Sequence, residues 1–158
     1  MRLYRVFAYL IALEVAVQAA AHAYGAAGLG HWIWSDGHTV TKADVEENSG
    51  VPITGRWAEE LHGVNGAMLI PLLALAFMVV AVIVRRQVNG ALAWAGIVLG
   101  LVAFQVVLGF ATIAVPALGM LHAVNALALL LAALHAARLQ RVAAHPGAVD
   151  ASLSGANT

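Results

Sequence analysis

Two histidines that occur in the same short motif are the residues of this chain best suited to bind a metal. Residues 61–66 read Leu-His-Gly-Val-Asn-Gly, and residues 121–126 read Leu-His-Ala-Val-Asn-Ala. The histidines, His62 and His122, are 60 positions apart, and each motif opens a long apolar run. A neutral imidazole binds a transition metal through one ring nitrogen while the other donates a hydrogen bond. The pattern predicts a pair of metal ligands if folding brings the two motifs together.

The composition restricts both the class of protein and the metal chemistry. Of 158 residues, 62% are hydrophobic and 10% are charged, and the formal net charge is zero. These values are typical of an integral membrane protein and exclude a basic surface for nucleic acid. The absence of cysteine excludes disulfides, iron–sulfur clusters and haem attached through cysteine. Any metal must therefore be held by histidine, carboxylate or neutral oxygen ligands.

Four apolar runs approach or exceed the roughly 20 residues that a helix needs to cross a bilayer. They cover residues 3–24, 61–84, 91–115 and 120–137. We expect an all-α, polytopic four-helix bundle over residues 1–142, with a polar loop at 25–60 and a disordered tail at 143–158. The first run could instead be a signal peptide, because residues 21–23 read Ala-His-Ala. We favour an uncleaved helix, because the run is long and contains Glu14 and Gln18.

The basic residues predict the orientation of this bundle. One end of the predicted helices carries Arg2, Arg5, Arg85, Arg86, Arg138 and Arg141, and the other carries only Lys42 and Arg56. By the positive-inside rule, both termini face the cytoplasm and the polar loop faces outward, and we expect the cell inner (plasma) membrane as the location. His62 and His122 then lie at one depth, near the outer ends of the second and fourth helices.

An internal repeat predicts which helices face each other. Residues 15–18 read Val-Ala-Val-Gln and residues 102–105 read Val-Ala-Phe-Gln, and the two histidine motifs extend this similarity. The pattern indicates a duplicated helical hairpin with the polar loop inserted in the first copy, although chance similarity between apolar segments is an alternative. Parallel repeats place equivalent helices across a common axis. We therefore predict that His62 and His122 are axial ligands of a haem, most simply b-type, between the second and fourth helices.

Residues around the two histidines could shape and support such a site. The residue four positions after each histidine is glycine or alanine, on the same helix face, and would leave room for a flat macrocycle. The asparagine three positions after each histidine could support the site by hydrogen bonding. Alternatives are close helix packing, hydrogen bonds between helices and, for a lone histidine, a packed contact. The candidate cofactor-binding residues are Asn65, Gly66, Asn125, Ala126, Gln18, Gln105 and His22.

These motifs resemble heme A synthase, a membrane enzyme family built from two four-helix halves. Residues 59–62 match the family's Glu-x-x-His, residues 105–109 are similar to its Gln-x-x-Leu-Gly, and His122 falls where a fourth-helix histidine belongs. The similarity covers about residues 5–140, which correspond to one half. It implies haem binding, and an oxidoreductase activity with Glu59 as the catalytic acid. The chain departs from the family at Gly63, where arginine is common, and in lacking a cysteine pair in its outer loop.

The best interpretation is a haem-binding membrane protein that serves cytochrome b-like electron transfer or haem handling. Expected partners are the lipid bilayer and either a second copy or a respiratory or oxidase-assembly complex. The alternatives are a cofactor-free accessory subunit, or a small transporter using Glu14, Gln18 and Gln105 as a polar path. Glu59 is alternatively an ordinary loop carboxylate, and His135 is interpreted as an interfacial or structural residue.

Overall fold

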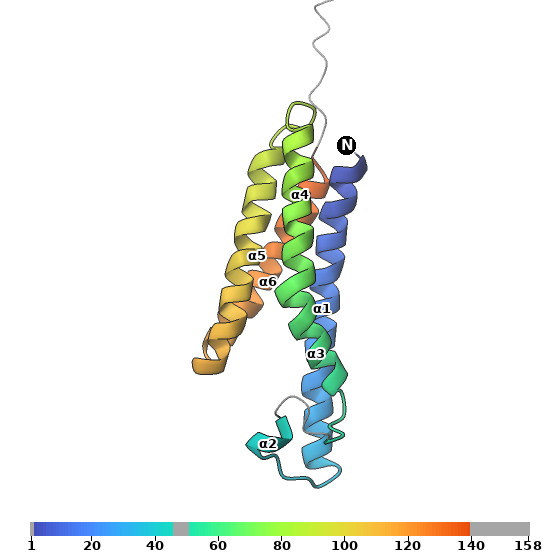
Figure 1. Ribbon diagram of the computed structural model, residues 1–158, viewed down its shortest axis with the longest axis vertical. Helices are drawn as coiled ribbons and strands as arrows, with labels where there is room; N and C mark the ends of the chain where they lie inside the picture. Colours follow the sequence, from blue (N-terminus) through green and yellow to red (C-terminus); the bar gives the residue numbers. More distant parts are fainter. Residues whose placement is uncertain (1, 46–50, 140–158) are drawn as a thin grey trace, which may run out of the picture.

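Every regular element in the part of the chain described by this computed structural model, residues 2–45 and 51–139, is a helix (Figure 1). The predicted tail at 143–158 and Arg141 lie outside these residues. The helices are α1 (Arg2–Trp34), α2 (Lys42–Val45), α3 (Arg56–Val64), the π-helical turn η1 (Asn65–Leu69), α4 (Ile70–Val84), α5 (Ala91–Ala114) and α6 (Leu118–Ala137).

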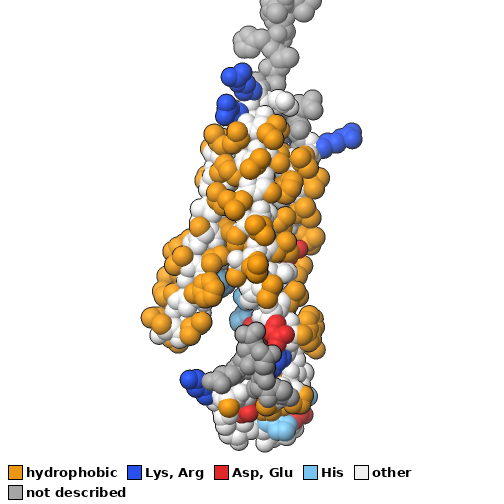
Figure 2. All heavy atoms as spheres, viewed as in Figure 1, with side chains coloured by type: hydrophobic (Ala, Val, Ile, Leu, Met, Phe, Trp, Pro, Cys, Tyr) orange, Lys and Arg blue, Asp and Glu red, His pale blue; other side chains and the backbone are white. Residues whose placement is uncertain are grey.

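Four helices of the described chain are long and apolar enough to cross a membrane. They are α1, the continuous α3–η1–α4 segment, α5 and α6. Hydrophobic side chains cover much of the outer face of the bundle that is seen in Figure 2. Leu72, Val107 and Leu131, for example, are each more than 60% exposed on three different helices. An apolar exterior suits a bilayer, and the expectation of an all-helical chain with four helices able to span a membrane is confirmed.

The four long helices form a square in which α4 and α6 stand on one diagonal. α1 packs against α4 and α6, and α5 packs against the same two helices. Alanines such as Ala8, Ala74 and Ala133 are fully buried where helices meet, and small residues of this kind allow close approach of backbones in membrane bundles. Tyr4 and Phe77 are the largest fully buried side chains, and their ring centres lie 4.7 Å apart.

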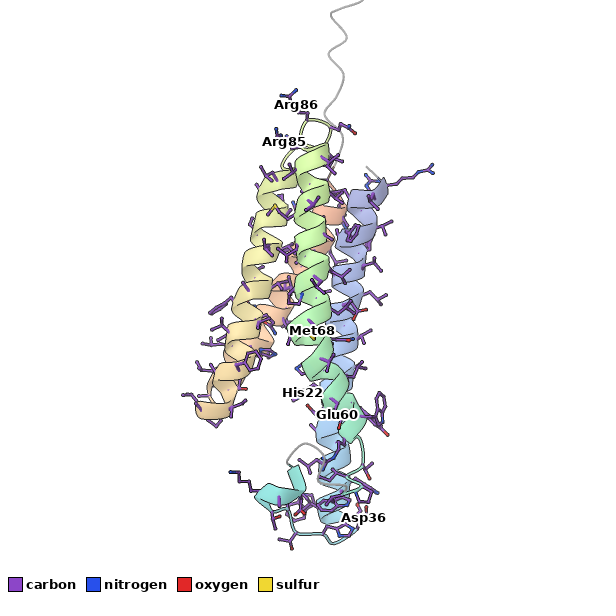
Figure 3. The ribbon with its side chains drawn as sticks, in the orientation of Figure 1. His22, Asp36, Glu60, Met68, Arg85 and Arg86 are labelled. Carbon is purple, nitrogen blue, oxygen red and sulfur yellow. The ribbon has the colours of Figure 1, made fainter. Side chains whose placement is uncertain are left out.

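The two ends of the bundle differ in charge and in packing. One end, here called the basic end, carries Arg2, Arg5, Arg85, Arg86 and Arg138 (Figures 2 and 3). The continuous core of buried residues fills this half of the bundle, running from Tyr4 to Val15 on α1 and from Leu129 to Ala137 on α6. The opposite end, here called the loop end, is where α1 joins α2 and where α5 joins α6 (Figure 1). The loop end is less completely packed, which leaves space for a site.

The helices α1 and α3 extend further than the predicted spans. α1 ends at Trp34 rather than near residue 24, and α3 begins at Arg56 rather than residue 61, so both ends of the predicted loop at 25–60 are helical. A 33-residue helix is about 50 Å long, whereas about 30 Å suffices to cross the hydrocarbon. The pair therefore projects beyond the α5–α6 turn (Figure 1). Hydropathy marks where a helix leaves the membrane, not where it stops being helical.

Glycines on α1 allow the segment before α3 to pack directly on its backbone. A Cβ atom added to Gly28 would lie 2.1 Å from the carbonyl oxygen of Thr54. A Cβ atom on Gly25 would lie 2.4 Å from the carboxylate oxygen Oε1 of Glu59. Gly55, which precedes α3, has φ of 80°, a left-handed conformation that glycine adopts without strain. The register of α3 on α1 is thus set by contacts that larger residues would prevent.

A π-helical turn interrupts the second membrane helix just after His62. The N–H of Ile70 donates to the carbonyl of Asn65, five residues earlier. Pro71 explains the irregularity, because proline has no N–H to donate to Ala67 and its ring crowds that carbonyl. Single π turns within α-helices occur frequently at functional sites. Here the turn separates the histidine-bearing α3 from the tightly packed α4.

Candidate functional site

A cavity of about 590 Å³ lies between the four long helices, on the loop-end side of the buried core. Its polar lining comes from five side chains on four helices, His22, His62, His122, Gln18 and Gln105. The rest of the wall is apolar, and half of its residues are glycine or alanine, among them Gly66, Gly109 and Ala126. Figure 2 shows a notch between the α5–α6 turn and the projecting α1–α3 pair, with histidine side chains at its edge. The cavity therefore combines an apolar interior with a few convergent polar groups, as ligand sites do.

The two motif histidines meet in this cavity from opposite corners of the square. The ring centres of His62 and His122 lie 6.1 Å apart, with an angle of 65° between the ring planes. His62 Nδ1 lies 3.1 Å from the backbone carbonyl oxygen of Gln18. Because a carbonyl only accepts, Nδ1–H is the donor, and Nε2 of the neutral ring keeps its lone pair. His62 is thus held in the tautomer that metal-binding histidines use.

The ring of His122 is accommodated by a glycine on the neighbouring helix. A Cβ atom added to Gly109 would lie 3.3 Å from Cε1 of His122, closer than most side chains tolerate. Nδ1 of His122 is buried and has no hydrogen-bond partner among the described residues. Gln105 fixes the local backbone, because its Nε2 donates to the His122 carbonyl oxygen at 3.1 Å. Two α5 residues, Gly109 and Gln105, therefore fix where the His122 ring lies.

The two motif asparagines play different parts. Asn125 is buried, and its Nδ2 donates to the carbonyl oxygen of Leu101 at 3.0 Å and to Oε1 of Gln105 at 2.6 Å. Asn125 therefore braces Gln105, which lines the cavity, without lining it itself. Asn65 is the first residue of the π-helical turn and is not among the residues that line the cavity. The symmetric role expected from the repeat does not extend to these positions, because η1 changes the helix geometry in only one copy.

Gln18 is a cavity residue whose side-chain amide is buried with neither of its polar atoms hydrogen-bonded among the described residues. Its side chain is only 7% exposed, it lines the cavity, and neither Nε2 nor Oε1 has a partner within the described chain. Gly66 lies against it, since a Cβ atom there would be 3.4 Å from Gln18 Oε1. Gly66 and Ala126 both line the cavity, as their spacing from the histidines predicts. Glu14, one turn away on α1, has a buried Oε2 without a partner in the same residues but does not line the cavity.

A third histidine and a carboxylate extend the row of imidazoles towards the loop end. The ring centres of His22 and His62 lie 5.1 Å apart at 38°. His22 Nδ1 lies 3.1 Å from Oε2 of Glu59, and these side chains are 63% and 42% exposed. Figure 3 shows His22 at the level of α3. The sequence identified His22 and Glu59 as separate candidates but did not predict their contact. Two signals for it are Gly25, which makes room for the Glu59 side chain on α1, and the position of Glu59 one helical turn before His62.

His135 and His31 lie apart from this row. His135 is exposed near the basic end, with its ring centre 4.0 Å from that of Trp94. At the loop end, His31 Nε2 lies 3.7 Å from Oδ1 of Asp36. Within residues 2–45 and 51–139, no group of three or more histidine and carboxylate side chains is arranged to hold a metal ion by itself.

Comparisons of the chain with protein families, curated proteins and solved structures find no match.

Proposed function

We propose that this chain is a haem-binding membrane protein in which His62 and His122 are the axial ligands. The observation that carries the proposal is the approach of these two imidazoles across a cavity in the bundle, with ring centres 6.1 Å apart. Two imidazoles on opposite sides of one metal place their ring centres about 6.4 Å apart, because each metal–nitrogen bond is about 2 Å long. Haem needs only two protein ligands, which suits a site without a larger ligand group.

The chain's own residues would hold and orient the macrocycle. The hydrogen bond to the Gln18 carbonyl keeps Nε2 of His62 ready to coordinate. Gly66, Gly109 and Ala126 leave room in the cavity because they carry little or no side chain, and most of the other lining residues are apolar. A bound haem would supply one-electron chemistry at its iron, of use in electron transfer or in haem handling.

A cofactor-free packing role accounts for fewer of these features. Histidines that only join helices are expected to satisfy their buried nitrogens within the bundle. Instead, His122 Nδ1 and both amide atoms of Gln18 are buried without a partner in the described chain. Each such group costs about 1–3 kcal/mol if nothing occupies the cavity. An occupant with polar substituents would remove part of this cost.

The finer features of the predicted architecture belong to the same proposal. Five arginines at one end of the bundle support an orientation with both termini in the cytoplasm and the site near the outer leaflet of the plasma membrane. The equivalent placement of His62 and His122 on diagonal helices supports a duplicated hairpin. Because the chain resembles only one half of heme A synthase, the proposal includes assembly as a homodimer or within a respiratory or oxidase-assembly complex.

The absorption spectrum of the purified protein tests the proposal. Protein expressed with added haem and purified in detergent should show a sharp low-spin haem spectrum. His62→Ala and His122→Ala should each lose that spectrum, whereas His135→Ala, which removes an exposed histidine outside the cavity, should keep it. A colourless native protein, or alanine variants at both ligand positions with the native spectrum, would refute haem binding.

An enzymatic version of the proposal makes a separate claim about Glu59. If the chain oxidises haem O as the resemblance to heme A synthase implies, Glu59 acts as the catalytic acid beside His22. Glu59→Gln should then abolish haem O conversion while leaving the haem spectrum unchanged. Conversion at the native rate in this variant would exclude Glu59 from the chemistry.

A further inference from the structure

His22 lies beside the proposed haem site but is not one of the two proposed haem ligands. Its ring centre lies 5.1 Å from that of His62, on the side towards the loop end, and its side chain is 63% exposed. We propose that His22 and His62 form a site for a divalent transition-metal ion of the Zn²⁺ type, and that this ion and haem compete for His62.

The spacing of the three imidazoles distinguishes the two kinds of site. Two imidazoles bound to one tetrahedral ion have ring centres about 5.2 Å apart, against about 6.4 Å when they lie on opposite sides of a metal. The 5.1 Å between His22 and His62 matches the tetrahedral case, and the 6.1 Å between His62 and His122 is closer to the opposed case. One histidine, His62, belongs to both pairs.

Both proposed ligand histidines have a hydrogen-bond acceptor beside one ring nitrogen, Nδ1. His22 Nδ1 lies 3.1 Å from Oε2 of Glu59, and His62 Nδ1 lies 3.1 Å from the carbonyl oxygen of Gln18. Each Nδ1–H can donate to its oxygen, which leaves both Nε2 atoms with lone pairs for a metal. A carboxylate behind a ligand histidine is a recurrent feature of zinc sites, and it raises the basicity of the ligand.

The exposure of His22 allows exchange of the ion with solvent. His22 lines the cavity and contacts Glu59, and 63% of the His22 side chain and 42% of the Glu59 side chain are exposed. Two protein nitrogens leave two positions of a tetrahedral ion for water, so the site is open and labile rather than structural. This agrees with the absence of a larger ligand group among the described residues.

Competition with haem follows from the shared ligand and rests on the proposed function. Nε2 of His62 can coordinate only one metal at a time. An ion held by His22 and His62 therefore removes one axial ligand from haem, and bound haem removes one ligand from the ion. Zinc in the outer compartment would slow the loading of haem into the chain.

Metal titration of the full chain, expressed without haem and purified in detergent, tests the site itself. Co²⁺, whose visible absorption reports imidazole coordination, should bind with one equivalent and be displaced by Zn²⁺. His22→Ala should lose binding, and His135→Ala, the matched control, should bind as the native protein does. Glu59→Gln should weaken binding by about 10–100-fold. A native protein that binds neither ion, or a His22→Ala variant with native affinity, would overturn the proposal.

Two further arms separate this proposal from haem binding. His122→Ala should bind Zn²⁺ normally while failing to bind haem, and prior loading with Zn²⁺ should slow haem uptake in the native protein but not in His22→Ala. Zinc binding without any haem binding would refute the proposed function and leave the ion site standing. Haem binding that is unaffected by bound zinc would show that the ion does not use His62, and would overturn the shared site.

Discussion

Replacement of Gly28 by alanine would show how far the α1–α3 contact holds the site together. A Cβ atom at this position would lie 2.1 Å from the carbonyl oxygen and 2.7 Å from the carbonyl carbon of Thr54. These are backbone atoms, which cannot rotate away, so the segment leading into α3 must move. Overpacking of this kind costs about 1–3 kcal/mol. Because α3 carries Glu59 and His62, the same movement should loosen the site.

Gly30→Ala is the matched control, because it lies on the same helix and a Cβ atom there would meet nothing within 4 Å. Both variants gain up to about 1 kcal/mol of helix propensity. The difference between them therefore isolates the overpacking at Gly28. For a chain of this size, each kcal/mol changes Tm by about 2–4 °C. Gly28→Ala should unfold several degrees below Gly30→Ala.

Thermal unfolding in detergent, followed by circular dichroism, measures this difference, and haem retention on dilution reports the effect on the site. Gly28→Ala is expected to lose haem faster than Gly30→Ala. Equal melting temperatures and equal haem retention in the two variants would show that the segment at Thr54 does not pack on α1 as described.

Three other predictions concern the α5–α6 side of the site and the loop end. Gly109→Val places methyl groups against the His122 ring and should lower the haem absorbance per protein, whereas unchanged absorbance would mean that this ring does not need the space. Gln105→Leu removes the hydrogen bond to the His122 carbonyl and should lower the free energy of unfolding by about 1–3 kcal/mol in denaturant titration; a native value would contradict it. Hydrogen bonds from the side chain and backbone of Thr41 hold the pKa of Asp44 below its usual 3.8, so their stabilisation is present above pH 3.8 and is lost as pH falls through the lowered pKa. Thr41→Val should raise the pKa of Asp44 towards 3.8 in an NMR titration. An unchanged pKa would show that the Thr41 side chain does not cause the lowering.

The membrane-crossing segments were predictable because hydropathy is a local property. The third helix, predicted at 91–115, is α5 at Ala91–Ala114, and the fourth, predicted at 120–137, is α6 at Leu118–Ala137. Each of these runs ends at a turn or an arginine, so its length follows from the transfer cost of its own residues. The extension of α1 to Trp34 was not predictable in this way, because its contacts are ones that hydropathy does not describe: the Thr54 backbone lies against Gly28, and the His38 ring stacks on Trp32.

The sequence by itself determined the residue types at the site and their approximate depth. Two equivalent motifs in helices of the same direction are enough to indicate that His62 and His122 lie near one level. Their distance of 6.1 Å, the glycine that makes room for the His122 ring and the shape of the cavity required the tertiary structure. Those features depend on how each helix is rotated about its axis, which contacts between residues far apart in the chain decide.

The tertiary structure also decided which polar residues act together. It groups His22 and Glu59 with His62, and it gives Asn125 a bracing role that Asn65 does not share. The physical reason is that a repeat in sequence specifies similar helices but not similar surroundings. The π-helical turn at Asn65–Leu69 and the long α1–α3 contact occur in only one copy, so equivalent residues meet different neighbours.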